Sequence, residues 1–178
     1  MERLRYPEKF MGGESLQTSF YLAGGCATEW RQYLMDRMTS DEFYNAVIID
    51  PVSSAYDPKK NTEWEFNTMR RSDCIVFWFA AETLQPISLF ELGTVCRDHL
   101  KPMIVGIHPQ YEKVDTLITQ LKLFRPDVRI VFDLNHVLSE MEQFVEVNSG
   151  VSYDTDYIQS TGECSKHLDD VGKLGPRC

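Results

Sequence analysis

Short apolar runs alternate along the chain with longer segments in which apolar residues recur every three or four positions. Such runs are typical of strands buried in a sheet, and the longer spacing indicates amphipathic helices. The predicted strands are residues 19–23, 46–49, 74–80, 103–107 and 128–132. The predicted helices are residues 27–38, 62–71, 88–100, 114–124 and 136–147. The pattern therefore predicts five consecutive strand–helix units.

Strands that alternate with helices through short connections predict an α/β fold, an open parallel sheet with helices on both faces. For five strands, the flavodoxin-like order 2-1-3-4-5 is the expected version. Ligands bind such sheets outside the carboxyl ends of the strands where the order reverses, which here falls between the first and third strands. Residues 23–26 and 80–91 are therefore the expected surroundings of a ligand site.

The periodic pattern ends near residue 148, after which the chain turns polar. We expect one folded domain over residues 1–148 and a polar C-terminal tail over residues 149–178, because 178 residues is near the size of a single domain. Residues 1–9 carry charges of both signs with no apolar segment behind them, so no secretory signal is expected. The expected location is the cytoplasm.

Charge and residue usage exclude several classes of partner. Lys and Arg number 18 against 27 Asp and Glu, a formal net charge of −9 that opposes phosphate neutralisation, so polymeric nucleic acid is not expected. The longest apolar runs are far shorter than the roughly 20 residues of a membrane-spanning helix, so no membrane partner is expected. The 5 cysteines and 4 histidines are dispersed, and we expect no disulfide framework, no metal and no organic cofactor.

The most informative segment, residues 86–93 (PISLFELG), falls at the predicted ligand edge. Ser88 and Glu91 have the spacing of a capping box, in which a serine N-cap and a glutamate three residues later satisfy backbone amides. The alternative is that Glu91 faces the cleft, where the positive end of the helix holds its carboxylate ready to attack an electrophilic sugar carbon. Both interpretations place Glu91 in the first turn of a helix.

Three further features fall at the same edge of the predicted sheet. Glu65, in the first turn of its predicted helix, either complements the helix dipole or faces the cleft, and Trp64 either packs in the core or stacks on a heterocyclic base. Tyr21 is either a core side chain or a hydroxyl that orients a carboxylate. Gly24 and Gly25 allow a ligand to approach the backbone closely, although they form neither a GxGxxG motif nor a Walker motif.

Together these residues resemble the nucleoside 2-deoxyribosyltransferase-like family, which includes related nucleotide N-glycosidases. The matching elements are Tyr21-Leu22-Ala23-Gly24-Gly25 with Trp30, then Asp50-Pro51, Trp64-Glu65, Ser72-Asp73 and residues 86–93. The resemblance implies that residues 1–148 are a flavodoxin-like catalytic domain, an N-glycosyl transferase or hydrolase that acts on a small nucleoside or nucleotide. It also implies a homodimer or a higher homo-oligomer.

The resemblance also implies roles for individual residues. Glu91 matches the nucleophilic glutamate that forms a glycosyl-enzyme intermediate, Tyr21 matches the tyrosine that positions it, and Glu65 matches an acidic residue that helps protonate the departing base. Ser88 matches a serine that contacts phosphate in the nucleotide-hydrolysing branch. The substrate-binding residues implied are Ala23, Gly24, Gly25, Asp50, Trp64 and Ser88. Two family residues are absent, an aspartate shortly before the nucleophile and an arginine after the Asp-Pro step.

The expected function is cleavage or transfer of the N-glycosidic bond of 2'-deoxyribonucleosides or their 5'-monophosphates. One alternative is a glycohydrolase of NAD or another nucleotide signal, because the same carboxylate chemistry acts on any ribosyl bond. Another is a non-catalytic nucleotide-binding module that keeps the sheet and the capping box. Base preference, and the choice between water and a second base as acceptor, stay open at this point.

Overall fold

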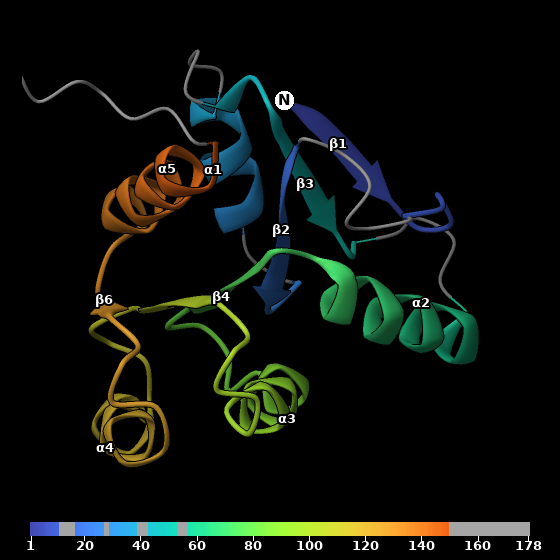
Figure 1. Ribbon diagram of the computed structural model, residues 1–178. Helices are drawn as coiled ribbons and strands as arrows, with labels where there is room; N and C mark the ends of the chain where they lie inside the picture. Colours follow the sequence, from blue (N-terminus) through green and yellow to red (C-terminus); the bar gives the residue numbers. More distant parts are fainter. Residues whose placement is uncertain (11–16, 27–28, 39–42, 53–56, 150–178) are drawn as a thin grey trace, which may run out of the picture.

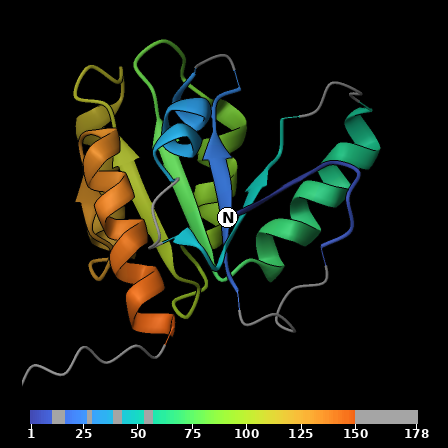
Figure 2. The same ribbon diagram turned by 90° about the horizontal axis from the view of Figure 1, so that it is seen from above.

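A six-stranded parallel sheet with helices on both faces forms the protein, as the computed structural model shows for residues 1–10, 17–26, 29–38, 43–52 and 57–149 (Figures 1 and 2). The strands are β1 (Glu2–Arg5), β2 (Thr18–Gly24), β3 (Ala46–Asp50), β4 (Cys74–Phe79), β5 (Met103–Ile107) and β6 (Ile130–Val131). The helices are α1 (Trp30–Arg37), α2 (Pro58–Arg71), α3 (Pro86–Val95), α4 (Val114–Phe124) and α5 (Leu134–Ser149). No described helix is long and apolar enough to cross a membrane.

The strand order is β1-β3-β2-β4-β5-β6, with every neighbouring pair parallel. Its last five members reproduce the predicted order 2-1-3-4-5, so the flavodoxin-like fold class is confirmed. The prediction of five strands was wrong by one, because β1 adds a parallel edge strand beside β3 (Figure 1). Most side chains of this strand are polar, and its pairing depends on a partner more than forty residues away.

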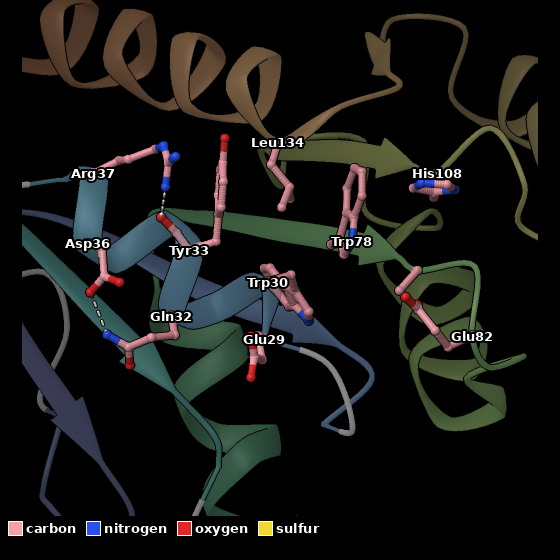
Figure 3. A pocket seen from close by; sticks show the side chains of 11 residues that line it. Glu29, Trp30, Gln32, Tyr33, Asp36, Arg37, Trp78, Glu82, His108 and Leu134 are labelled. Atoms are coloured by element: carbon pink, nitrogen blue, oxygen red, sulfur yellow. Dashed lines mark hydrogen bonds between the residues drawn. The ribbon is translucent and has the colours of Figure 1, made fainter.

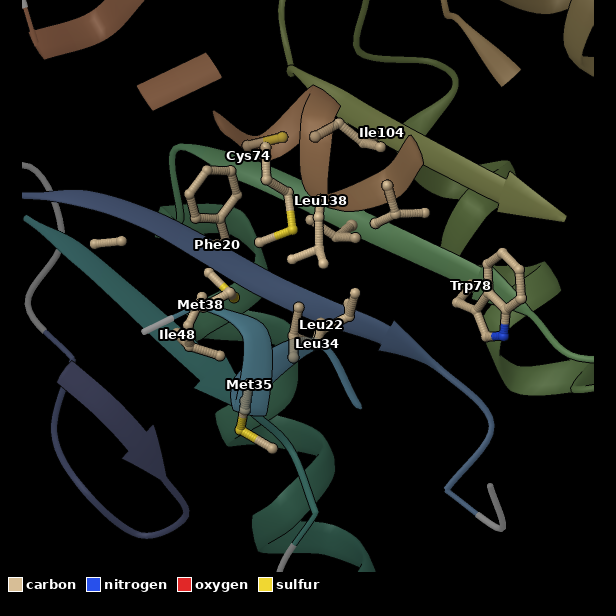
Figure 4. Packing of buried hydrophobic residues seen from close by; sticks show 14 of the residues in the cluster. Phe20, Leu22, Leu34, Met35, Met38, Ile48, Cys74, Trp78, Ile104 and Leu138 are labelled. Carbon is tan, nitrogen blue, oxygen red and sulfur yellow. The ribbon is translucent and has the colours of Figure 1, made fainter. Parts of the chain in front are cut away.

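Alternate side chains of the central strands feed two separate cores. Cys74, Val76 and Trp78 of β4 face the core beneath α1 and α5, which Figure 4 shows. Their neighbours Ile75, Phe77 and Phe79 face the core beneath α2, α3 and α4. Burial on both faces explains why the strand reads as a continuous apolar run rather than as an alternating one.

Several element boundaries differ from the predicted ones. Helix α2 begins at Pro58, four residues before the predicted start, because the Asp57 side chain accepts hydrogen bonds from the amides of Lys59 and Lys60 at 3.1 Å each. Helix α3 runs from Pro86 to Val95 rather than over residues 88–100. The predicted C-terminal tail falls almost entirely on residues 150–178, which lie outside the described residues.

Candidate active site

A cavity of about 340 Å³ opens at the carboxyl ends of β2 and β4, where the strand order reverses. We call it the carboxylate cavity. Its lining includes seven of the nine predicted site residues: Tyr21, Ala23, Gly24, Gly25, Glu65, Ser88 and Glu91. The other lining residues are Cys26, Arg31, Pro51, Thr83, Gln85, Pro86 and Ile87. The predicted edge of the sheet is therefore where the structure brings these side chains together.

Helix α3 places Glu91 in the cavity without a capping box. The helix begins at Pro86, and its N-cap is Gln85, which makes no side-chain capping bond. Proline fits the first position of a helix because its missing N–H is not needed there. Ser88 is therefore a third-position residue rather than the N-cap, and Glu91 lies in the second turn. The predictions of a first-turn carboxylate and a Ser88 cap were both wrong.

Burial makes the two carboxyl groups of the cavity weaker acids than an ordinary glutamic acid. Desolvation, reinforced by the charge of Glu65, raises the pKa of Glu91 to about 7, while Arg31 opposes the shift. Burial also raises the pKa of Glu65, again opposed by Arg31. Glu65 occupies the middle of α2 rather than its first turn, because the helix starts at Pro58. Neighbouring carboxyl groups with raised pKa values can hold one proton between them near neutral pH.

Tyr21 lies beside these carboxyl groups at the end of β2. Only 1% of its surface is exposed, and burial, followed by the charges of Glu91 and Glu65, raises its pKa well above the ordinary value. Its hydroxyl therefore keeps its proton and is a potential donor to an ionised carboxylate.

The glycine loop after β2 is fixed by side chains that the sequence analysis did not select. Gln85 accepts a hydrogen bond from the Gly25 amide through Oε1 at 2.8 Å and donates to the Ala80 carbonyl at 3.4 Å. Gln85 itself has a left-handed backbone with φ of 51°. At Gly24, where φ is 152°, a Cβ would lie 2.6 Å from the Trp78 carbonyl, so glycine is required.

Arg31 is another residue of the cavity lining that the sequence analysis did not select. It is 4% exposed, and its guanidinium donates to the carbonyls of Gly25 at 2.7 Å, Gly24 at 2.7 Å and Leu22 at 3.2 Å. The spacing of apolar residues in the sequence could have revealed its burial, since Arg31 precedes Leu34 and Met35 by three and four positions and so shares their apolar helix face.

Two predicted substrate contacts lie elsewhere. The Trp64 indole donates to the Glu8 carbonyl at 2.8 Å, and its ring meets Tyr6 edge-on with centroids 6.0 Å apart, so it packs on the N-terminal segment. Asp50 is buried at the end of β3, in ion pairs with arginine side chains. Neither residue is part of the cavity lining.

A second cavity, of about 400 Å³, opens at the same edge on the opposite face of the sheet (Figure 3). We call it the aromatic cavity, because its lining includes Trp30, Tyr33, Trp78 and His108. The figure shows Arg37 beside Tyr33, and the guanidinium carbon lies 3.5 Å from the centre of that ring. Among the described residues, no group of three or more His, Cys, Asp or Glu is placed to hold a metal ion.

The fold and the carboxylate cavity define a flavodoxin-like α/β protein with paired glutamates and a tyrosine at its topological switch point. A family model described as "Nucleoside 2-deoxyribosyltransferase like" matches residues 17–111, a region that contains every lining residue of the carboxylate cavity. The chain belongs to this family, and the resemblance seen in the sequence is confirmed.

The comparison with solved structures supports the fold alone. A crystal structure of a conserved protein from Enterococcus faecalis V583 is similar to this chain, with a TM-score of 0.54 and 17% sequence identity. The match covers 72% of this chain and 99% of that protein. No curated protein matches the sequence.

Proposed function

We propose that the protein cleaves or transfers the N-glycosidic bond of 2'-deoxyribonucleosides or their 5'-monophosphates, with Glu91 as the nucleophile. One observation carries the proposal. Glu91 shares a cavity with Glu65 and Tyr21, and the pKa of Glu91 is raised to about 7. Membership of the nucleoside 2-deoxyribosyltransferase-like family supports the same chemistry.

In the proposed first step, ionised Glu91 bonds to C1' of the sugar as the bond from C1' to the base nitrogen breaks. The pair holds one proton, which passes to Glu65 as Glu91 becomes ionised. The bonding electrons leave with the base, and Glu65 donates this proton to the base, which makes the base a better leaving group. The carboxylate stabilises and then captures the oxocarbenium-like sugar as a glycosyl ester. The Tyr21 hydroxyl orients the carboxylate before attack.

In the second step, water or a second base attacks C1' and releases Glu91 as a carboxylate. The acceptor gives up a proton to Glu65, which restores the starting state of both groups. Ser88 is 5% exposed and lies near the start of α3 in the cavity wall. We assign it, together with the amides at that helix end, to the 5'-phosphate of a monophosphate substrate. The backbone of residues 23–25 forms the wall that the sugar meets.

A product panel tests this proposal. The protein is incubated with 2'-deoxyribonucleosides, their 5'-monophosphates, the matching ribose compounds and NAD, each with and without a free acceptor base, and the products are separated by chromatography. We expect release or exchange of base from a 2'-deoxy substrate. Mass spectrometry of quenched reactions should then show one deoxyribosyl adduct on the peptide that contains Glu91.

Three results would contradict the proposal. Base release that persists in Glu91→Ala excludes the assigned nucleophile. Cleavage of NAD alone indicates a nucleotide-signal glycohydrolase instead. Calorimetric binding of a nucleotide without turnover indicates a non-catalytic binding module. The expected homo-oligomer is tested separately by sedimentation velocity.

A further inference from the structure

Arg31 is held by an unusually complete set of backbone acceptors. Its two terminal nitrogens donate to three carbonyls at the end of β2 and just after it, those of Leu22, Gly24 and Gly25. The guanidinium carbon also lies 4.4 Å from the centre of the Trp30 ring, and the Trp30 indole donates to the same Gly25 carbonyl at 3.1 Å. The guanidinium therefore has one well-defined position beneath the cavity wall.

Asp50 at the end of β3 provides the counter-charge. Its Oδ1 lies 3.6 Å from Nε of Arg31, an atom that is buried and has no hydrogen-bond partner among the described residues. Its Oδ2 accepts from Arg3 at 2.5 Å and lies 3.5 Å from Arg5, both on the edge strand β1. Two arginines of β1 thus neutralise Asp50, and part of the positive charge of Arg31 is left uncompensated.

That charge faces a site that is otherwise acidic. Arg31 is the one basic side chain among the described residues that line the carboxylate cavity. The ionisable groups that surround it come from five parts of the fold: Tyr21 of β2, Cys26 of the following loop, Asp50 of β3, Glu65 of α2 and Glu91 of α3.

We propose that Arg31 is a positioning residue for glycosyl transfer, whose positive charge favours the ionised form of Glu91 for attack while its hydrogen bonds hold the Gly24–Gly25 wall in place. The inference rests on the proposed function for its catalytic meaning. Burial lowers the pKa of Arg31, but a guanidinium still holds its proton at neutral pH, and its planar fork can bind several carbonyls at once. Removal of the charge leaves desolvation and Glu65 unopposed, which favours the protonated form of Glu91.

The first test uses the wild-type protein and nuclear magnetic resonance. The ¹⁵N resonance of Arg31 Nε, assigned with Arg31→Lys, is followed against pH together with the ¹³C carboxyl resonance of Glu91. We expect both to change with one midpoint near pH 7, the value set by Glu91. The part of the Arg31 change that follows the Glu91 carboxyl resonance should vanish in Glu91→Gln, which leaves Glu65 as the carboxyl group that titrates beside Arg31 in the cavity. A flat Arg31 resonance, or one whose pH dependence is the same in wild type and in Glu91→Gln, overturns the proposal.

The second test compares two buried arginines. Arg125 is 3% exposed and likewise holds carbonyls, those of Asp98 and Lys101, but it lies outside the cavity. Arg31→Met should raise the Glu91 midpoint by about one pH unit, whereas Arg125→Met should leave it unchanged. In Arg31→Met, the smaller ionised fraction of Glu91 alone should then lower kcat about fivefold at pH 7. Arg31→Lys should return the Glu91 midpoint toward that of wild type.

Equal Glu91 midpoints in the two methionine variants overturn the proposal. If Arg31→Met does not fold, the wild-type resonance experiment decides. A wild-type protein that releases no base in the product panel overturns the proposed function instead, because the resonance experiment reports the coupling of Arg31 to Glu91 without turnover. The two failures are therefore distinguishable.

Discussion

The two cavities at the carboxyl edge of the sheet differ in how they surround charge. In the carboxylate cavity, Glu91 and Glu65 are partly buried, and burial raises the pKa of each. In the slightly larger aromatic cavity the carboxylates are Glu29, Asp36 and Glu82, all of them exposed (Figure 3). The aromatic cavity therefore has more acidic side chains but surrounds them with water.

The comparison shows that burial of charge, rather than cavity size or the number of acids, marks a candidate for catalysis. A carboxylate in water is well solvated, so it is a weak nucleophile and a poor acid at neutral pH. In a desolvated pair of carboxyl groups, protonation of one group favours ionisation of the other. One group is then a better nucleophile, and the other is a better acid near neutral pH. The arginines of the two cavities differ in the same way, because Arg31 of the carboxylate cavity is buried and the Arg37 side chain of the aromatic cavity is exposed.

The largest expected effect is a difference in enzymatic activity between a variant of the carboxylate cavity and a variant of the aromatic cavity. Glu91→Gln removes the nucleophile with little change of shape and should lower kcat about 10³-fold or more for the substrate found in the product panel. Glu82→Gln makes the same chemical change in the aromatic cavity and should leave kcat and KM within about twofold of wild type. Comparable losses in the two variants would contradict the assignment of the site to one face.

A second prediction concerns stability against pH. The pKa of Glu91 is raised on folding from an ordinary 4.5 to about 7, so between these values the folded state binds a proton that the unfolded state has lost. The contribution of Glu91 to the free energy of unfolding is therefore greatest below pH 4.5 and is lost as the pH rises through 7. Glu91→Gln lacks the ionisation, so it should be more stable than wild type at pH 8 by on the order of 2 kcal/mol, a figure reduced for partial solvent exposure.

Urea denaturation at pH 4.5 and pH 8 measures this difference. Glu82→Gln provides the matched control, because Glu82 is exposed and its substitution should change stability by less than about 0.5 kcal/mol at either pH. A Glu91→Gln variant that gains nothing between the two pH values would show that the carboxylate is as well solvated as those of the aromatic cavity.

The sequence predicted the parts of the fold that local patterns determine. The strands β4 and β5 are continuous apolar runs because both of their faces are buried, and α4 has the predicted bounds of 114–124. Strand β1 was missed because nothing in its four residues requires a strand. It forms beside β3, where Arg3 and Arg5 meet Asp50, a contact between residues far apart in the chain.

The same distinction holds within the candidate site. Tyr21 and Glu91 follow from topology, since they flank the point where the strand order reverses, and the structure places both in the cavity. Gln85 could not be found this way, because its role depends on a hydrogen bond to Gly25, sixty residues earlier. Trp64 was expected near a substrate, but its position is set by the distant backbone of Glu8.

The smallest expected effect concerns Gln85, whose left-handed backbone is costly for a residue other than glycine. Gln85→Gly relieves about 1 kcal/mol of strain and loses hydrogen bonds of similar total value, so the free energy of unfolding should change by less than about 1 kcal/mol. Activity should still fall, about five- to tenfold in kcat/KM, because the Gly25 amide loses its acceptor and the cavity wall loosens. Steady-state kinetics and urea denaturation of one preparation separate the two quantities.

The matched control for Gln85 lies in the aromatic cavity. Gln32 is exposed and donates to Asp36 at 2.6 Å within one helix, so Gln32→Ala should change neither stability by more than about 0.5 kcal/mol nor kcat/KM by more than twofold. A Gln85→Gly variant with full activity would mean that the strained residue serves the fold alone. A variant that keeps its stability but loses activity would show that the left-handed backbone of Gln85 serves the carboxylate cavity. The fold would then gain nothing from that strained conformation, whereas the site would depend on the geometry that it imposes.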